Sequence, residues 1–168
     1  YELYISTGKA VELWNRLLKD KRLKPAGLGS RDTLRLEMAY PLYGQDVDEN
    51  TTPLEASLEK FINFDRDFIG KDALLAEKIS GVKRLLIAFK TDSRKSPRHG
   101  YVITKDGKEI GIVTSGSFSP SLSCGIGLGY VESAYAKIGE DILIKSGGTE
   151  ITAAICEKPF YTKGTART

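Results

Sequence analysis

The apolar residues of segment 9–20 recur every three or four positions. This spacing predicts a helix with one apolar stripe facing a core. The stripe consists of Ala10, Leu13, Trp14, Leu17 and Leu18. Residues 1–5 alternate enough to predict a short strand before this helix, and Ser6, Thr7 and Gly8 end that strand.

Two further helices are expected in the first half of the chain. Ser30 is a suitable N-cap for a helix that starts at Arg31, and Asp32 in its first turn suits the helix dipole. This helix must end before Pro41, because proline cannot continue it. Another helix is predicted over residues 71–79, with Gly81 as its stop signal.

From residue 82 onward the pattern changes to short strands separated by turns. Strands are predicted over 84–90, 101–105, 109–114, 126–132, 141–145 and 150–157. The dipeptides Asp106-Gly107 and Gly147-Gly148 are typical of tight hairpins. Six short strands at this spacing predict a small antiparallel barrel or sandwich.

This change of pattern predicts an α+β chain with two domains. Residues 1–80 are mixed α/β and have too few strands to close their own sheet, so we expect them to complete a larger domain. Residues 81–168 are expected to form a C-terminal antiparallel β-barrel domain. The first residue is Tyr1 rather than Met, so we expect the chain to continue a longer protein.

Composition and charge narrow the classes of partner. The chain is 40% apolar and 28% charged, with a net charge of +3, and its basic and acidic residues are mixed. This mixing argues against a nucleic-acid surface, and no apolar run is long enough to span a bilayer. Cys124 and Cys156 lie far apart and His99 is the sole histidine, so we expect no zinc site but two buried thiols in a reducing compartment.

Motifs for nucleophilic or phosphate chemistry are absent from the sequence. The glycine-rich run 125–129 precedes a strand rather than a helix, so we interpret its glycines as places of close strand approach. Arg31 and Arg35 share a helical face, which an anionic ligand or a carboxylate of the protein would offset. Four acidic residues that lack calcium-loop spacing are expected to form a solvated loop: Asp46, Asp48, Glu49 and Glu55.

Several longer strings occur in a fixed order along nearly the whole chain. They are PAGLGSRDTLRLE at 25–37, PLYGQD at 41–46, TPLEA at 52–56, DFIGK at 67–71, GIVTSGSFSP at 111–120, GYV at 129–131 and PFY at 159–161. In content and order the strings resemble the C-terminal half of the glycine cleavage system T-protein (aminomethyltransferase) family. Residues 38–40 and 57–61 depart from the family pattern, which concerns the wall of a pocket rather than the family itself.

The resemblance implies an enzyme that uses tetrahydrofolate. Such an enzyme takes the aminomethyl group carried on the lipoyl arm of the H-protein, releases ammonia and forms methylenetetrahydrofolate. The family's essential aspartate belongs to the N-terminal half, so no catalytic residue is expected in this chain, and the chain alone should be inactive. The family implies as partners the lipoylated H-protein and the N-terminal half, and as location the bacterial cytoplasm or the mitochondrial matrix.

Three residues match positions that the family uses for folate. Glu2 resembles the glutamate that hydrogen-bonds the pterin ring, whose adjacent N–H groups suit a carboxylate. Arg31 resembles the arginine that meets the acidic tail of folate, where a guanidinium can form a bidentate pair. Tyr161 resembles a C-terminal tyrosine near the ligand. No metal site is implied.

Two other functions stay open from the sequence. The C-terminal modules of sarcosine and dimethylglycine dehydrogenases, and folate-dependent demethylases, share this architecture, and a flavin domain upstream would favour them. A non-catalytic folate-binding scaffold is the second alternative, and the absence of the aspartate from the N-terminal half would favour it.

Overall fold

The computed structural model describes residues 2–164 and divides into two compact units, one up to Asp32 and one from Thr33. The first unit contains the single turn η1 (Thr7–Lys9) and helix α1 (Ala10–Leu17). Helix α2 (Leu28–Glu37) contains the point of division. The second unit continues through η2 (Glu59–Phe61) and helix α3 (Lys71–Ser80) to the strands.

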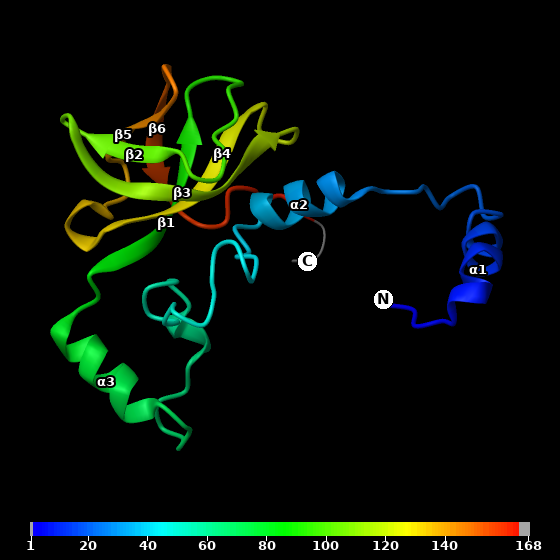
Figure 1. Cartoon of the computed structure of the whole chain (residues 1–168), viewed down its shortest axis with the longest axis horizontal. Helices are drawn as coiled ribbons and strands as arrows, with labels where there is room; N and C mark the ends of the chain where they lie inside the picture. Colours follow the sequence, from blue (N-terminus) through cyan, green and yellow to red (C-terminus); the bar gives the residue numbers. More distant parts are fainter. Residues whose placement is uncertain (1, 165–168) are drawn as a thin grey trace. The chain divides into compact units, whose positions relative to one another are not determined.

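The six predicted strands are present and form a closed antiparallel barrel (Figure 1). Around the barrel their order is β1-β4-β3-β2-β5-β6, and every neighbouring pair is antiparallel. The strands are β1 (Arg84–Thr91), β2 (Val102–Lys105), β3 (Lys108–Ser119), β4 (Cys124–Glu132), β5 (Asp141–Ser146) and β6 (Thr149–Cys156), with η3 (Ser133–Tyr135) after β4. The prediction of a barrel is confirmed.

The two predicted hairpin dipeptides lie between β2 and β3 and between β5 and β6. Asp106 and Gly107 both have positive φ, 50° and 80°, and so do Gly147 and Gly148, at 48° and 83°. Positive φ at both central residues is the geometry of a two-residue turn whose twist matches that of the strands. The second turn sets the register of β5 and β6 throughout, whereas a bulge between Ile103 and Thr104 shifts the register of β2 against β3.

Alternation along β1 creates two separate cores. Ile87 and Phe89 point into the barrel, while Leu86 and Ala88 point outward. The inner cluster is completed by Ile103, Ile110, Val113, Val131, Ile142, Ile144, Ile151, Ala153 and Ile155. The outer cluster is completed by Leu36, Ala39, Ile126, Leu128, Tyr130 and Phe160, so the end of α2 and the C-terminal segment cover the outside of β1 and β4.

The glycine-rich run of β4 lies where strands and side chains approach most closely. A Cβ atom on Gly127 would stand 2.4 Å from Cζ of Phe89 and 2.8 Å from the Ser115 carbonyl oxygen. Gly125 and Gly129 are equally confined, with nearest atoms at 2.2 Å and 2.6 Å. The interpretation of these glycines as points of close approach is confirmed.

Three local predictions are wrong. Residues 2–6 form no strand, since the described chain offers them no neighbouring strand to pair with. Helix α2 begins at Leu28, because the Gly27 carbonyl already accepts the amides of Ser30 and Arg31 at 3.1 and 3.4 Å. Ser30 is therefore inside the helix rather than its N-cap, and Asp32 lies beyond the first turn.

The first and third helices are found where they were expected. Helix α1 is shorter than predicted and is followed by a turn in which Asp20 accepts the Arg22 amide at 3.0 Å. Helix α3 ends at Ser80, and Gly81 follows with φ of 78°. Within residues 2–164 every helix is too short or too polar to cross a membrane. The domain boundary between residues 80 and 81 stays a prediction.

Candidate functional site

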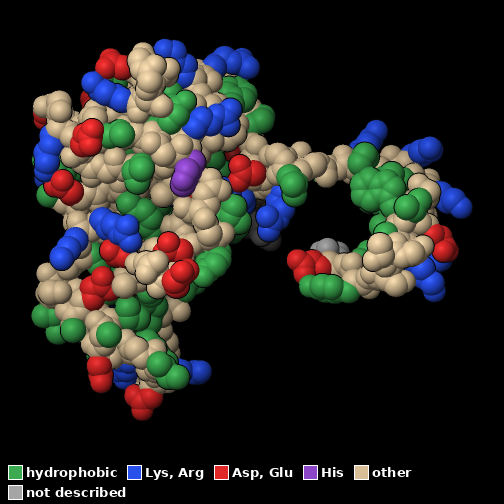
Figure 2. Space-filling model, viewed as in Figure 1, with side chains coloured by type: hydrophobic (Ala, Val, Ile, Leu, Met, Phe, Trp, Pro, Cys, Tyr) green, Lys and Arg blue, Asp and Glu red, His purple; other side chains and the backbone are tan. Residues whose placement is uncertain are grey.

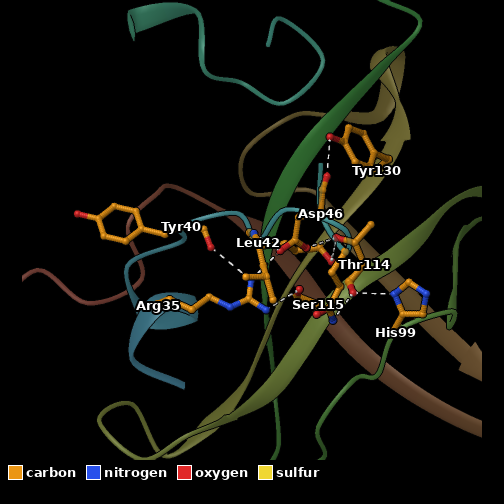
Figure 3. Close-up of polar contacts among 10 residues, drawn as sticks. Arg35, Tyr40, Leu42, Asp46, His99, Thr114, Ser115 and Tyr130 are labelled. Carbon is orange, nitrogen blue, oxygen red and sulfur yellow. Dashed lines mark hydrogen bonds and ion pairs between the residues drawn. The ribbon is translucent and has the colours of Figure 1, made fainter. Parts of the chain in front are cut away.

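The C-terminal end of α2 is joined to the barrel by a buried ion pair. Nη1 of Arg35 lies 2.6 Å from Oδ2 of Asp46, and the side chains are 11% and 0% exposed. The other terminal nitrogen of Arg35 donates to Oγ of Ser115 on β3 at 2.9 Å. Arg35 also donates to the Tyr40 carbonyl at 3.3 Å. One guanidinium thus connects the helix, the following loop and the barrel wall (Figure 3).

Asp46 is satisfied by donors from several directions. Its Oδ1 accepts the Thr114 hydroxyl at 2.5 Å, and its Oδ2 also accepts the Leu42 amide at 2.9 Å. Its carbonyl accepts the Tyr130 hydroxyl at 2.9 Å. A buried carboxylate with this many donors and a guanidinium partner is fully compensated, whereas removal of one partner would leave a charge uncompensated.

A second buried carboxylate fixes the last residue of α2. Oε1 of Glu37 accepts the Ser119 hydroxyl at 2.5 Å, and Oε2 accepts the Ser121 hydroxyl at 2.8 Å. The Ser121 amide adds a contact to Oε1 at 3.2 Å. The carbonyl of Glu37 accepts the amide of Tyr161 at 3.0 Å. Together, the contacts of Arg35 and Glu37 hold the end of α2 and the C-terminal segment against the barrel.

The expectation of a solvated acidic loop is therefore wrong for Asp46. Its side chain is buried because Arg35, Thr114 and Leu42 supply the donors that water would otherwise provide. Glu55 is also paired, with Nε of Arg84 at 3.0 Å. Asp48 and Glu49 are exposed, as expected of a solvated loop. Asp46 is the last residue of the string PLYGQD, but the spacing of apolar residues did not indicate that its side chain is buried.

The two arginines of α2 were expected to be offset either by an anionic ligand or by a carboxylate of the protein. For Arg35 the structure shows a carboxylate of the protein, that of Asp46. Arg31 is exposed and lies in the first turn of the same helix. The two arginines, one turn apart, therefore have different environments.

The other two sequence-predicted residues lie in different units. Glu2 is exposed in the first unit, where Oε2 accepts the Tyr4 hydroxyl at 2.7 Å. Tyr161 is partly buried in the second unit, next to the buried Phe160. The Tyr161 amide donates to the Glu37 carbonyl, a contact within the second unit. Their roles toward a ligand stay predictions.

Two groups near this site have shifted pKa values, one because of burial and one because of a hydrogen bond. Burial raises the pKa of Tyr130 to about 12, so this phenol stays protonated and donates to Asp46 at every physiological pH. The guanidinium of Arg84, 4.6 Å from the centre of the Tyr130 ring, opposes that shift. Hydrogen bonding to Glu55 raises the pKa of Arg84 itself.

The cysteines and the histidine have structural surroundings. Cys124 and Cys156 are free thiols, as expected, but each is only partly buried, and this burial raises the pKa of both. A ring nitrogen of His99, Nδ1, lies 2.9 Å from the Thr114 carbonyl oxygen. Within residues 2–164 no three His, Cys, Asp or Glu side chains gather closely enough to hold a metal ion.

Comparison with known proteins matches both parts of the chain to one family. Residues 84–162 match the glycine cleavage T-protein C-terminal barrel domain, and residues 1–66 match the GCVT N-terminal domain. The aminomethyltransferase of Halothermothrix orenii is 54% identical over 164 residues, which are 95% of this chain and 46% of that protein. The aminomethyltransferase of Caldanaerobacter subterraneus subsp. tengcongensis is 48% identical over 167 residues, 97% of this chain and 45% of that protein.

A solved structure has the same fold. The crystal structure of glycine cleavage system aminomethyltransferase T from Bartonella henselae matches with a TM-score of 0.84 and 33% identity, over 92% of this chain and 44% of that one. The closed barrel therefore belongs to the class of T-protein C-terminal barrel domains. The chain belongs to the glycine cleavage T-protein family. It spans a little under half the length of the curated relatives it matches.

Proposed function

We propose that this chain is the C-terminal half of a tetrahydrofolate-dependent aminomethyltransferase of the glycine cleavage system. The observation that carries the proposal is the 54% identity to an aminomethyltransferase over 95% of the chain. The substrates are an aminomethyl group on the lipoyl arm of the H-protein and tetrahydrofolate. The products are ammonia and methylenetetrahydrofolate. The relatives named above are all called aminomethyltransferases, and none of them is called a dehydrogenase or a folate-binding scaffold.

Two exposed side chains, those of Glu2 and Arg31, suit the polar groups of a folate. The exposed carboxylate of Glu2 can accept the adjacent N–H donors of a pterin ring. The exposed guanidinium of Arg31 can pair with a carboxylate of the folate tail in a bidentate fashion. Arg31 lies in the first turn of α2, where backbone amides and the helix dipole also favour an anion.

Tyr161 is the third proposed ligand residue. Its backbone is held by the Glu37 carbonyl, so its position depends on the anchored end of α2. A partly buried phenol combines an apolar ring with one hydroxyl, which suits contact with an aromatic ligand. We propose that the H-protein and the N-terminal half of the same protein complete the active site, and that the latter supplies the catalytic aspartate.

The test is an ammonia-release assay with the full-length protein. With an aminomethylated lipoyl H-protein and tetrahydrofolate, the full-length protein should release ammonia and form methylenetetrahydrofolate. Residues 1–168 alone should release none above background under the same conditions. Absence of tetrahydrofolate-dependent release from the folded full-length protein would contradict the proposed function, and release by residues 1–168 alone would contradict the proposed division of the site.

A further inference from the structure

The apolar stripe of helix α1 is open on the surface of the first unit. Val11, Trp14 and Leu17 are spaced three residues apart, so they lie along one side of the helix, and they are 71%, 52% and 39% exposed. The opposite side carries Glu12 and Arg16, which are also exposed. Figure 2 shows apolar side chains gathered over this helix. Helix α1 thus has one polar and one apolar side, and both are exposed.

The segments before and after α1 add to the exposed apolar residues of this unit. Three of them precede the helix and one follows it, and no residue of segment 2–32 is buried. We define the α1 surface by the exposed apolar residues Leu3, Tyr4, Ile5, Val11, Trp14, Leu17 and Leu23. Apolar surfaces of this kind are typical of contacts with another part of a protein or with a partner.

The length of α1 indicates that its apolar side needs a cover. The helix has eight residues, and isolated helices shorter than about 12–15 residues are only marginally stable in water. Most of the stability of a short helix therefore comes from the packing of its apolar side. Segment 2–32 contains no buried residue against which α1 could pack, so this packing has to come from outside its unit.

The family match indicates what covers the surface. Residues 1–66 match the GCVT N-terminal domain, and the chain spans 46% of the Halothermothrix orenii relative. A domain has its own hydrophobic core, yet segment 2–32 contributes no buried residue to one. The rest of the same domain is thus the partner that would complete this core. Neither a second copy of the chain nor the H-protein belongs to that domain.

We propose that the α1 surface is the contact surface of segment 2–32 for the N-terminal half of the same protein, which covers it with apolar side chains. The proposal rests on the proposed function only in that this function includes an N-terminal half. It assigns Trp14 and its neighbours to the core of a domain rather than to a site for folate or for the H-protein.

Hydrogen exchange of the wild-type protein tests the contact without any variant. The backbone amides of α1 should exchange at least about a hundredfold more slowly in the full-length protein than in residues 1–168, because covered helices open less often. The amides of β5 are the control and should exchange at similar rates in both, since the barrel closes its own hydrogen bonds. Equal rates for α1 in the two proteins would overturn the proposal.

The same experiment identifies the occupant. Protection of α1 should be the same at two protein concentrations about tenfold apart, and it should not require the H-protein. Protection that grows with concentration would assign the surface to a second copy, and protection only with the H-protein would assign it to that partner. Either result would contradict the proposal. Ammonia release by the same preparation tests the proposed function separately, so an active protein with an unprotected α1 would contradict this inference alone.

A matched pair of variants tests the apolar side itself. In the full-length protein Trp14→Ala should lower the melting temperature by several degrees, because it truncates a side chain that the contact buries. Arg16→Ala truncates a long side chain on the polar side and should change the melting temperature little. Equal shifts for the two variants would contradict the proposal.

Discussion

The two compact units of this chain contain similar apolar residues in opposite environments. In the barrel unit Phe89, Ile103 and Leu128 are fully buried. In residues 2–32 no residue is buried, and Trp14 is 52% exposed although it belongs to a regular amphipathic stripe. Figure 2 shows apolar side chains gathered on the surface over α1.

The comparison shows that spacing predicts a helix but does not predict what covers it. The stripe of α1 meets no buried core within the described residues of its unit. The barrel, by contrast, closes its own hydrogen bonds and encloses its own apolar side chains. We therefore expect substitutions of buried residues in the barrel unit to change stability, and substitutions of exposed polar residues in segment 2–32 to change binding instead.

The largest effect is expected at the buried ion pair. Asp46→Asn removes the charge that compensates Arg35 and should lower the free energy of unfolding by about 3–5 kcal/mol. Glu49→Gln is the matched control, because it makes the same change on an exposed side chain three residues away, and it should shift stability by less than about 0.5 kcal/mol. Chemical denaturation of both variants measures the difference. Similar small shifts in the two would mean that Asp46 does not anchor α2.

Replacing one glycine by alanine in each unit compares how tightly the two units are packed. Gly127→Ala places a Cβ atom 2.4 Å from the Phe89 ring, and this overpacking should lower stability by about 1–3 kcal/mol. Gly27→Ala meets nothing within 4 Å, so it should be nearly neutral. Thermal unfolding of each variant provides the measurement. If both substitutions are neutral, the close approach at Gly127 is not a constraint on the barrel.

The smallest effect is a dependence on pH. The pKa of Lys158 is about 8 in the folded protein and 10.5 in its unperturbed form, so between these values the unfolded chain binds more protons. The contribution of Lys158 to stability should therefore rise as pH increases from 8 to 10.5. Lys158→Met removes this group but retains an apolar stem. Subtracting the two profiles gives the titration of Lys158 together with its electrostatic interaction with Cys156, without that of Tyr130. A difference that stays constant over this range would contradict the lowered pKa.

The sequence predicted the barrel well, because its signals are local. Hairpin dipeptides with positive φ fix the turns, and alternation along each strand fixes the faces. The N-cap at Ser30 was wrong, because a single polar residue cannot show that Gly27 already starts the hydrogen-bonded turn. The burial of Asp46 was missed since its partners Arg35 and Thr114 are 11 and 68 residues away in the chain.

The candidate ligand residues came from family resemblance rather than from spacing. Glu2 and Arg31 are exposed polar residues, and neither periodicity nor burial distinguishes them from other exposed side chains. What the structure adds is the contrast between Arg31 and Arg35. One is exposed in the first turn of α2, and the other is buried against Asp46. We therefore predict that loss of Arg31 lowers the affinity for folate, whereas loss of Arg35 lowers the stability of the protein.

Calorimetric titration of tetrahydrofolate into the folded full-length Arg31→Ala protein tests the central claim most directly. A charge-assisted bidentate pair contributes about 1.5–3 kcal/mol, so affinity should fall roughly tenfold to a hundredfold while the melting temperature is unchanged. Arg31→Lys should recover only part of the affinity, since an ammonium lacks the planar fork, and Arg35→Ala should lower the melting temperature instead. Wild-type affinity in the Arg31→Ala protein would contradict the account and remove Arg31 from the folate site.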